Sequence, residues 1–334
     1  MKTLPWDALP RFALGHWPTP LEPLPRLSAE LGGPKVWLKR DDCSGLATGG
    51  NKTRKLEYLL GDAVASGADS VVTFGAVQSN HTRQTAAACA KAGLMCHQIL
   101  TRTVQKTGAG YETGGNVLLS KVLGAQQHIV APTDAKAYSM ALVEDLQAKG
   151  NTAYVIPAGG SNALGAVGYA QCAQELCEQA QEHGFELEYV MHASASAGTQ
   201  AGLLFGLQHL QAETQVLGVN VYHPDPAALS TRVEQLVRKM NDTYAPSTQL
   251  VAQAANVNHA YIGPGYGQPS AQCLDAIRTV ARLEGILFDP VYSGKALAAL
   301  IDQVTLGNLS GHKDVVLIHT GGSPALYVYE DAFA

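Results

Sequence analysis

Charge is scarce in this sequence, and it contains no run of like charges. Of its 334 residues only 15% are charged, and the formal net charge is -5 at pH 7. A protein without a basic face does not attract a phosphate backbone, so we expect no nucleic-acid partner. The hydrophobic fraction of 46% is instead typical of a globular protein with a large core, built as one large domain or two closely associated ones.

A long apolar run is also missing, above all at the start. Prolines and charged residues interrupt the opening stretch, MKTLPWDALPRFALGHW, before it could form the core of a signal peptide or a membrane span. We therefore expect a cytoplasmic protein that has no membrane partner.

Paired cysteines are absent as well, because none of the six forms a CxxC motif. Four of them fall where a helical pattern favours a small apolar residue. This predicts thiols in the core rather than a disulfide or a metal site. The six are Cys43, Cys89, Cys96, Cys172, Cys177 and Cys273, and the helical patterns contain Cys89, Cys172, Cys177 and Cys273.

What the sequence does contain is an alternation of strand and helix patterns. The strand candidates are rich in Val, Ile and Leu, and several are continuously apolar, as in parallel strands that are buried on both faces. The helical patterns between them mostly end in glycine. We predict an α/β fold with largely parallel sheet and no internal repeat. The strands are expected at 36–40, 70–75, 95–100, 127–131, 153–159, 189–194, 216–222 and 315–322, and the main helices at 82–93, 114–124, 139–150, 163–184 and 198–210.

Three turns that follow predicted strands have the character of binding loops, since ligands of parallel sheets lie at the carboxyl ends of the strands. Residues 78–81, QSNH, open a helix whose free amides could hold a carboxylate. Residues 194–199 offer hydroxyls and small side chains at another helix start, which suits a phosphate. They match neither GxxxxGK[ST] nor GxGxxG. The third turn, HTGGS at 319–323, ends the last predicted strand.

Lys52 is in an unusual position, because it lies at the predicted start of a helix, where the dipole disfavours a cation. An isolated lysine would ordinarily be a solvated loop residue. In an electropositive site beside a phosphate-binding turn, however, the pKa of an amine falls and it becomes a better nucleophile toward an aldehyde. A phosphate, a second anionic group and a flat polar ring next to Lys52 together indicate pyridoxal 5'-phosphate as cofactor.

Longer motifs carry a family resemblance from about residue 18 to 327. They include GGNKTRK at 49–55, QSNHTRQT at 78–85 and DPVYSGK at 289–295, with SAGTQAG, GPGYGQP and IHTGGSPALY in the same order. The sequence resembles the fold-type-II pyridoxal-phosphate enzymes, in particular the group of 1-aminocyclopropane-1-carboxylate (ACC) deaminase, D-cysteine desulfhydrase and L-cysteate sulfo-lyase. That fold has two open, twisted, mostly parallel sheets flanked by helices, and its members usually form homodimers.

The resemblance also implies a division of the chain. A larger domain, residues 1–50 plus 163–334, would bind the cofactor. A smaller domain, residues 51–162, would carry the Schiff-base lysine and the loop for the substrate carboxylate.

Cofactor roles follow from the same resemblance. Lys52 matches the Schiff-base lysine, which later takes the Cα proton as a free amine. Asn80 matches the residue that hydrogen-bonds the ring hydroxyl, and Thr320 would face the pyridine nitrogen. The residues that match phosphate-binding positions are Lys55, Ala197, Gly198 and Thr199.

Substrate roles are implied for a second set of residues. Ser79 matches the group that grips the carboxylate of a small amino-acid substrate. Tyr292 and Tyr266 match active-site tyrosines that donate a proton or hydrogen-bond the leaving group. The implied substrate-binding residues are Gln78, Ser79, Asn80 and His81, and no metal ligand is expected.

Two positions depart from the ACC deaminases, which have a glutamate at the position of Ser293 and an apolar residue at that of Thr320. The resemblance therefore favours β-elimination from a three-carbon amino acid with a sulfur leaving group, giving pyruvate and ammonia. The lysine loop, GTQ at 198–200 and DPVYSGK are more similar to sulfo-lyases, so L-cysteate is preferred and D-cysteine stays open. No pattern assigns a donor for the sulfonate among the candidates, which are His81, Ser44, Gln78, His192 and Arg102.

Other functions are disfavoured. A non-catalytic binding module on the same fold would be expected to have lost the lysine or the phosphate turn, and both are intact. A racemase or a deaminating dehydratase would need a site for a substrate hydroxyl.

Overall fold

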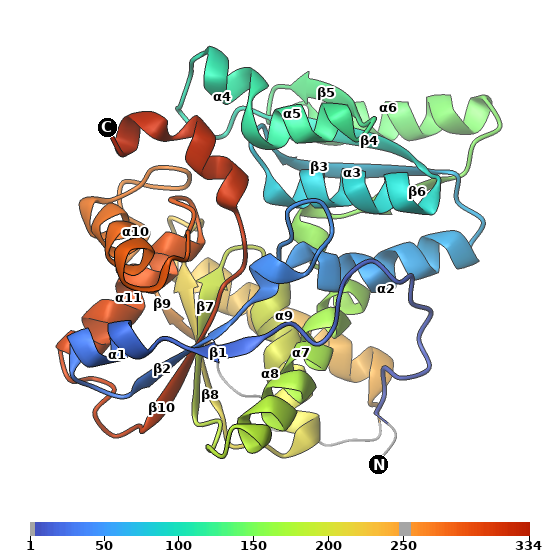
Figure 1. The fold of residues 1–334 in the computed structure, drawn as a ribbon. Coiled ribbons are helices and arrows are strands. Elements are labelled where there is room, and N and C mark those ends of the chain that lie inside the picture. The colour runs from blue at the N-terminus through green and yellow to red at the C-terminus, as the bar shows by residue number, and fades with distance from the viewer. Residues whose placement is uncertain (1–3, 247–254) are drawn as a thin grey trace.

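The computed structural model describes residues 4–246 and 255–334, and its ten strands form two separate sheets (Figure 1). The strands are β1 Leu21–Pro23, β2 Lys35–Lys39, β3 Ser70–Ala76, β4 Met95–Thr101, β5 Gln126–Val130, β6 Ala153–Ile156, β7 Tyr189–Ser194, β8 Gln215–Asn220, β9 Asn256–Asn258 and β10 Asp314–Ile318. The α-helices are α1 Pro25–Leu31, α2 Lys52–Ala65, α3 Asn80–Ala92, α4 Ala109–Thr113, α5 Gly115–Val122, α6 Ala135–Ala148, α7 Ala163–Glu182, α8 Gly198–Leu210, α9 Pro226–Tyr244, α10 Ala271–Glu284 and α11 Ser293–Thr305.

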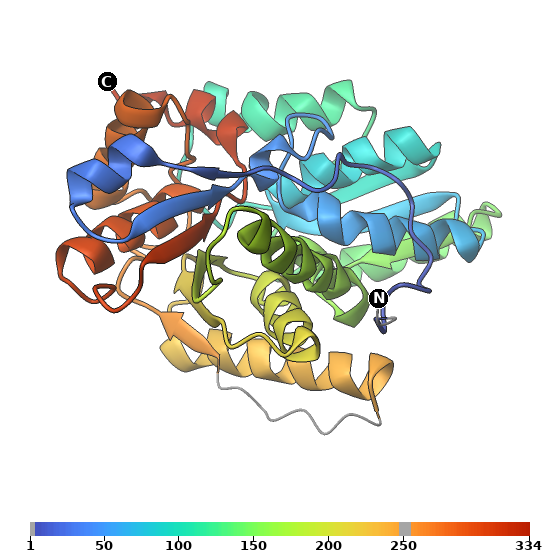
Figure 2. The same cartoon turned by 60° about the horizontal axis from the view of Figure 1, so that its bottom comes forward.

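The larger sheet has six strands in the order β1-β2-β10-β7-β8-β9, and only β1 pairs antiparallel. Val190 and Val316 pack with α7, α8 and α9 on one face, while Met191 and Leu317 pack with α1, α10 and α11 on the other. Figure 2 shows α7, α8 and α9, coloured olive to orange, together on one side of this sheet. Because helices cover both faces, consecutive residues of the central strands are buried, which is why these strands are continuously apolar.

The smaller sheet is wholly parallel, in the order β5-β4-β3-β6. Val71 packs with α2 and α3 on one face, and Val72 packs with α6 on the other. All four strands lie within residues 51–162, and the predicted domain limits stay a prediction. No helix in the described part of the chain has the length and apolar character needed to cross a membrane.

The predicted α/β fold with two mostly parallel sheets is confirmed. The eight expected strands are present, although those expected to reach 159, 222 and 322 end at Ile156, Asn220 and Ile318. The sequence did not reveal β1 and β9, since three residues are too few to show a period. Cys89, Cys96, Cys172 and Cys273 are buried free thiols, as expected of core residues. Cys177 is only half-buried, and Cys43 is exposed in the loop after β2.

A buried network of charges attaches the start of α2 to the larger sheet and to α7. Arg54, two residues after Lys52, donates from Nη2 to Asp41 Oδ1 and to Glu175 Oε2, both at 2.8 Å. Lys39 Nζ lies 2.9 Å from the same Glu175 oxygen, and the Tyr169 hydroxyl donates to Asp41 Oδ2 at 2.5 Å. Burial alone would raise the pKa of Asp41, but Arg54 beside it holds the pKa below its usual value. Each charge of the network is therefore matched by a partner.

Removing Arg54 would leave Asp41 buried without its ion-pair partner and Glu175 with Lys39 alone. We expect Arg54→Met to lower the free energy of unfolding by about 3–5 kcal/mol, the usual cost of breaking a buried ion pair from one side. Lys149→Met is the control, because Lys149 forms an exposed pair with Asp145 at 2.6 Å, worth at most about 0.5 kcal/mol. Urea denaturation measures both. Equal losses in the two variants would show that the network does not hold α2.

Candidate active site

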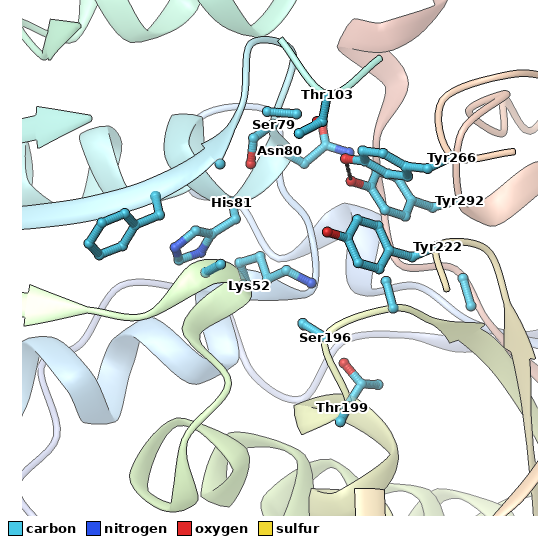
Figure 3. Close-up of a pocket in the computed structure, with 18 of the residues that line it drawn as sticks. Lys52, Ser79, Asn80, His81, Thr103, Ser196, Thr199, Tyr222, Tyr266 and Tyr292 are labelled. Carbon is cyan, nitrogen blue, oxygen red and sulfur yellow. Dashed lines mark hydrogen bonds between the residues drawn. The ribbon is translucent and has the colours of Figure 1, made fainter. Parts of the chain in front are cut away.

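A cavity of about 340 Å³ lies between the two sheets, where their parallel strands end (Figure 3). All three predicted turns contribute to its lining, with residues 79–81 after β3, residues 194–197 after β7, and Thr320 after β10. Among the described residues its lining includes no aspartate or glutamate, and its lysine and arginine side chains are Lys52 and Arg232. A cavity of this composition favours anionic ligands.

Lys52 is the first residue of α2, and its side chain extends into the cavity (Figure 3). Its Nζ donates to Asn51 Oδ1 at 3.2 Å, and no carboxylate in the described chain lies within ion-pair distance. Burial lowers the pKa of Lys52 to about 8. The backbone N–H of Asn51 donates to the backbone carbonyl of Thr320 at 3.1 Å, so the lysine loop and the turn after β10 are joined. Lys52 is thus a fixed amine with a sizeable unprotonated fraction near neutral pH.

Behind Lys52, a second lysine faces the start of α8. Lys55 is fully buried, and its Nζ donates to Ser161 Oγ at 3.0 Å, which in turn lies 2.8 Å from Ser196 Oγ. Burial, and then the charge of Lys52, hold the pKa of Lys55 well below its usual value. A Cβ added at Gly198 would lie 2.6 Å from Ser161 Oγ and 2.9 Å from Lys55 Nζ. Hydroxyls, a helix N-terminus and a lysine without a carboxylate partner in the described chain therefore converge as a cradle for an anion such as phosphate.

The turn after β3 presents the start of α3 to the cavity. Ser79 is the N-cap of this helix, and its Oγ accepts a hydrogen bond from the Thr82 amide at 3.3 Å. Asn80 Oδ1 accepts from Asn116 Nδ2 at 3.0 Å, while Asn80 Nδ2 has no partner among the described residues. The turn therefore offers amide donors to a ligand, with Asn80 oriented by a neighbouring side chain.

His81 also lines the cavity, and its hydrogen bonds determine its tautomer. The Thr73 hydroxyl donates to the Ile156 carbonyl at 3.0 Å, so it accepts from His81 Nε2 at 2.8 Å. Burial, and then the charges of Lys52 and Lys55, hold the pKa of His81 well below its usual value. His81 is therefore neutral, and its Nδ1, which has no partner among the residues that the structure describes, carries a lone pair rather than a proton.

Several predicted residues lie near the cavity without lining it. The Gln78 amide donates to the carbonyls of Tyr111 and Gly114, at 2.5 and 3.0 Å, so this side chain fixes the segment before α5 instead of facing a ligand. Of the five candidate sulfonate donors only His81 lines the cavity. Arg102 pairs with Glu112 at 3.0 Å. The side chains of Ser44, His192 and Gln78 form hydrogen bonds with backbone groups around the cavity.

Two tyrosines close the cavity on the side of the larger sheet. The hydroxyls of Tyr266 and Tyr292 are hydrogen-bonded to each other (Figure 3). Burial raises the pKa of both, so both are protonated at neutral pH. The ring of Tyr222 packs edge-on against Tyr266, with centroids 4.8 Å apart. Their hydroxyls therefore offer hydrogen-bond donors to a ligand on this side of the cavity.

Sequence reasoning missed many of the lining residues, and three of them bear on binding. Asn51 connects Lys52 to Thr199, because its Nδ2 donates to Thr199 Oγ1 at 3.4 Å. Tyr222 follows β8, and its place beyond the end of a parallel strand was a usable signal. Arg232 lies in the helical segment TRVEQLVRK, which gives no such signal, and only the tertiary fold brings it to the cavity.

Comparisons with known proteins agree with this geometry. Residues 12–321 match the family described as pyridoxal-phosphate dependent enzyme. The structure is similar to that of an ACC deaminase homologue, with 34% identity, a TM-score of 0.88, and 98% of this chain and 96% of that chain covered. A hydrogen sulfide-producing enzyme from Fusobacterium nucleatum has 13% identity and a TM-score of 0.66, with 92% and 96% of the chains covered. A threonine deaminase from T.th. has 18% identity and a TM-score of 0.65, with 91% and 92% covered. The last two similarities concern the fold alone.

The cradle at Gly198 predicts how a phosphorylated cofactor is held. We expect Gly198→Ala to raise the dissociation constant for pyridoxal phosphate at least about tenfold, because the added methyl group crowds Lys55 and Ser161. Gly110→Ala is the control, since a Cβ there meets nothing within 4 Å. Fluorescence titration of the cofactor-free proteins measures both constants. Equal affinities would contradict a phosphate at this position.

The lowered pKa of Lys52 predicts a distinct pH dependence. With a pKa of about 8, its free-amine fraction rises about tenfold between pH 7 and 9 and then levels off. The acetylation rate of Lys52 in cofactor-free protein by acetic anhydride, followed by peptide mass spectrometry, should rise in the same way. Free Nα-acetyl-lysine, with an ordinary pKa of about 10.4, should rise nearly a hundredfold. A hundredfold rise in the acetylation rate of Lys52 would mean that burial does not lower its pKa.

Proposed function

Because the chain belongs to the family of pyridoxal-phosphate-dependent enzymes, we propose that it is a β-elimination lyase that releases a sulfur leaving group from a cysteine-like amino acid. L-cysteate is the preferred substrate. In this reaction the Cα–H and Cβ–S bonds break, and the electron pair of the C–S bond leaves with sulfur. The remaining aminoacrylate takes up a proton at Cβ, and water hydrolyses the resulting imine. The products are pyruvate, ammonium and sulfite.

Cofactor binding is the first task of the proposed site. When bound, pyridoxal phosphate supplies the electron sink that stabilises negative charge at the substrate Cα. Lys52 would hold the aldehyde end, and Lys55 with the start of α8, at Ala197, Gly198 and Thr199, would hold the phosphate. The lowered pKa of Lys52 also suits it to take the Cα proton, since a base works best when its pKa lies near the working pH.

Orientation of the ring and of the substrate falls to the turns. Asn80 would donate to the ring hydroxyl through its Nδ2, which has no partner in the described chain, and Thr320 would face the ring nitrogen. Ser79 and the free amides at the start of α3 bind the substrate carboxylate. Neutral His81 accepts a hydrogen bond at Nδ1, which suits the substrate amine or a water molecule.

Tyr266 and Tyr292 serve the leaving group. Both keep their protons at neutral pH, so either can donate a hydrogen bond to sulfur-bound oxygen or deliver a proton. Their mutual hydrogen bond lets one hydroxyl replace the proton that the other gives up.

One observation carries the choice of a charged leaving group. Within the described chain the cavity is lined by Lys52 and Arg232 and by no carboxylate, although the protein as a whole has a net charge of -5. Lys52 and the cradle serve the cofactor, and the turn at Ser79 serves the carboxylate. Arg232 then remains for a second anion on the substrate, and a sulfonate meets that requirement. The thiol of D-cysteine, which is mostly uncharged at neutral pH, does not need it.

Ring opening of ACC is less well supported, even though an ACC deaminase homologue is 34% identical. The deaminases have a glutamate where this chain has Ser293. Ser293 does not line the cavity, and its hydroxyl donates to Asp289 Oδ1 at 2.6 Å. No acidic side chain therefore reaches the cofactor ring from this position.

The test is a pyruvate assay of the holoenzyme on L-cysteate, D-cysteine, L-cysteine, D-serine and β-chloro-L-alanine, with Lys52→Ala as the inactive control. We expect pyruvate and sulfite from L-cysteate. Arg232→Gln should lower kcat/KM for L-cysteate about 10- to 100-fold, which is the value of one charged hydrogen bond. It should change kcat/KM for β-chloro-L-alanine, whose β-substituent is uncharged, less than about twofold.

Other outcomes assign the enzyme differently. Pyruvate and sulfide from D-cysteine alone would make it a desulfhydrase. Equal losses on both substrates in Arg232→Gln would mean that Arg232 does not recognise the sulfonate. Activity that survives in Lys52→Ala would overturn the proposed chemistry.

A further inference from the structure

Lys295, the last residue of the DPVYSGK motif, is a second lysine in an unfavourable position. It lies in the first turn of α11, where the helix dipole disfavours a cation, and its side chain is fully buried. Burial lowers the pKa of Lys295 to about 8. A buried ammonium at this position costs free energy, so some interaction must compensate for it.

The compensation comes from a loop and not from a carboxylate. Lys295 Nζ donates to the carbonyls of Ile262 and Gly265, at 2.6 and 2.9 Å, and no acidic group in the described chain forms an ion pair with it. Asp289 and Cys273 are the titratable groups that face it. Asp289 is already engaged by the backbone amides of residues 291–293 and by the Ser293 hydroxyl.

The loop that Lys295 holds carries Tyr266. Gly265 has a φ of +148°, a conformation in which a side chain would be strained, and the loop forms only an isolated bridge between Gly265 and Gln268. Its own hydrogen bonds therefore do little to fix it. Residues outside the loop hold it in place instead. Lys295 does so on one side, and on the other the Tyr329 hydroxyl donates to the Gly267 carbonyl at 2.6 Å.

The partner of Tyr266 belongs to the same helix start as Lys295. Tyr292 is the N-cap of α11, three residues before Lys295, and its hydroxyl meets that of Tyr266. We propose that Lys295 is a positioning residue, which ties the 262–267 loop to the first turn of α11 and so keeps the two tyrosine hydroxyls within hydrogen-bond distance of each other at the cavity wall. The role in catalysis rests on the proposed function, whereas the positioning itself does not.

A double-mutant cycle separates positioning from general stability. Lys295→Met keeps the apolar stem and removes the donor, and we expect it to lower kcat about tenfold or more on L-cysteate and β-chloro-L-alanine, with cofactor affinity unchanged. Tyr266→Phe should have a similar effect. If Lys295 acts through Tyr266, the double variant is no slower than the slower single variant. Effects that multiply would overturn the proposal.

A second measurement does not depend on turnover. In protein labelled with 3-fluorotyrosine, Tyr266→Phe identifies the fluorine resonance of Tyr266, and Lys295→Met should shift or broaden it. Lys91→Met is the control, because exposed Lys91 also donates to a backbone carbonyl, that of Leu14 at 3.2 Å. It should leave the resonance unchanged. An unchanged resonance in Lys295→Met would overturn the proposal.

Two outcomes are kept apart by this design. If the wild-type holoenzyme eliminates none of the substrates, the proposed function fails, and the fluorine spectra still decide on Lys295. If Lys295→Met does not fold, Lys295→Gln, whose shorter amide reaches at most one carbonyl, takes its place in both measurements with the same expected direction.

Discussion

The ion network around Arg54 is the constraint on which the site depends. It joins β2, α2 and α7 in the protein interior, and it fixes the first turn of α2 from behind. Lys52 and Lys55 lie in that same turn, so their positions follow from it. The role proposed for Lys52 at the cofactor aldehyde needs a rigid helix start, because a displacement of about 1 Å is costly in catalysis.

The interior treats its cations in two different ways. Arg54 and Lys39 are matched by carboxylates, which makes them structural and chemically inert. Lys55 and Lys295 are buried and Lys52 is partly buried, all three without carboxylate partners in the described chain, and burial lowers the pKa of each. Lysines without carboxylate partners destabilise the protein locally. The same property makes anion binding and amine chemistry possible in this region.

The sequence was sufficient for the fold and for the part of the cavity wall that Lys52, the three turns and the two tyrosines form. Continuous apolar runs marked the buried parallel strands, and the glycine-rich turns after them marked the three binding loops. Arg232 and the true contacts of Gln78 could not be predicted, since a surface-like helix and a glutamine at a turn acquire their partners only through tertiary packing. The two short strands escaped for the same reason, because pairing with a neighbour, not local pattern, defines them.

The close approach of Gly321 to the lysine loop has a consequence for how this protein can vary. A Cβ at Gly321 would lie 2.8 Å from the Gly50 Cα, and Gly321 has a φ of +87°. Any side chain there would push the loop that precedes Lys52, although Gly321 is distant in sequence and carries no functional group. The position of Lys52 therefore depends on a glycine in the turn after β10, and a substitution there would disturb the site without removing any functional side chain.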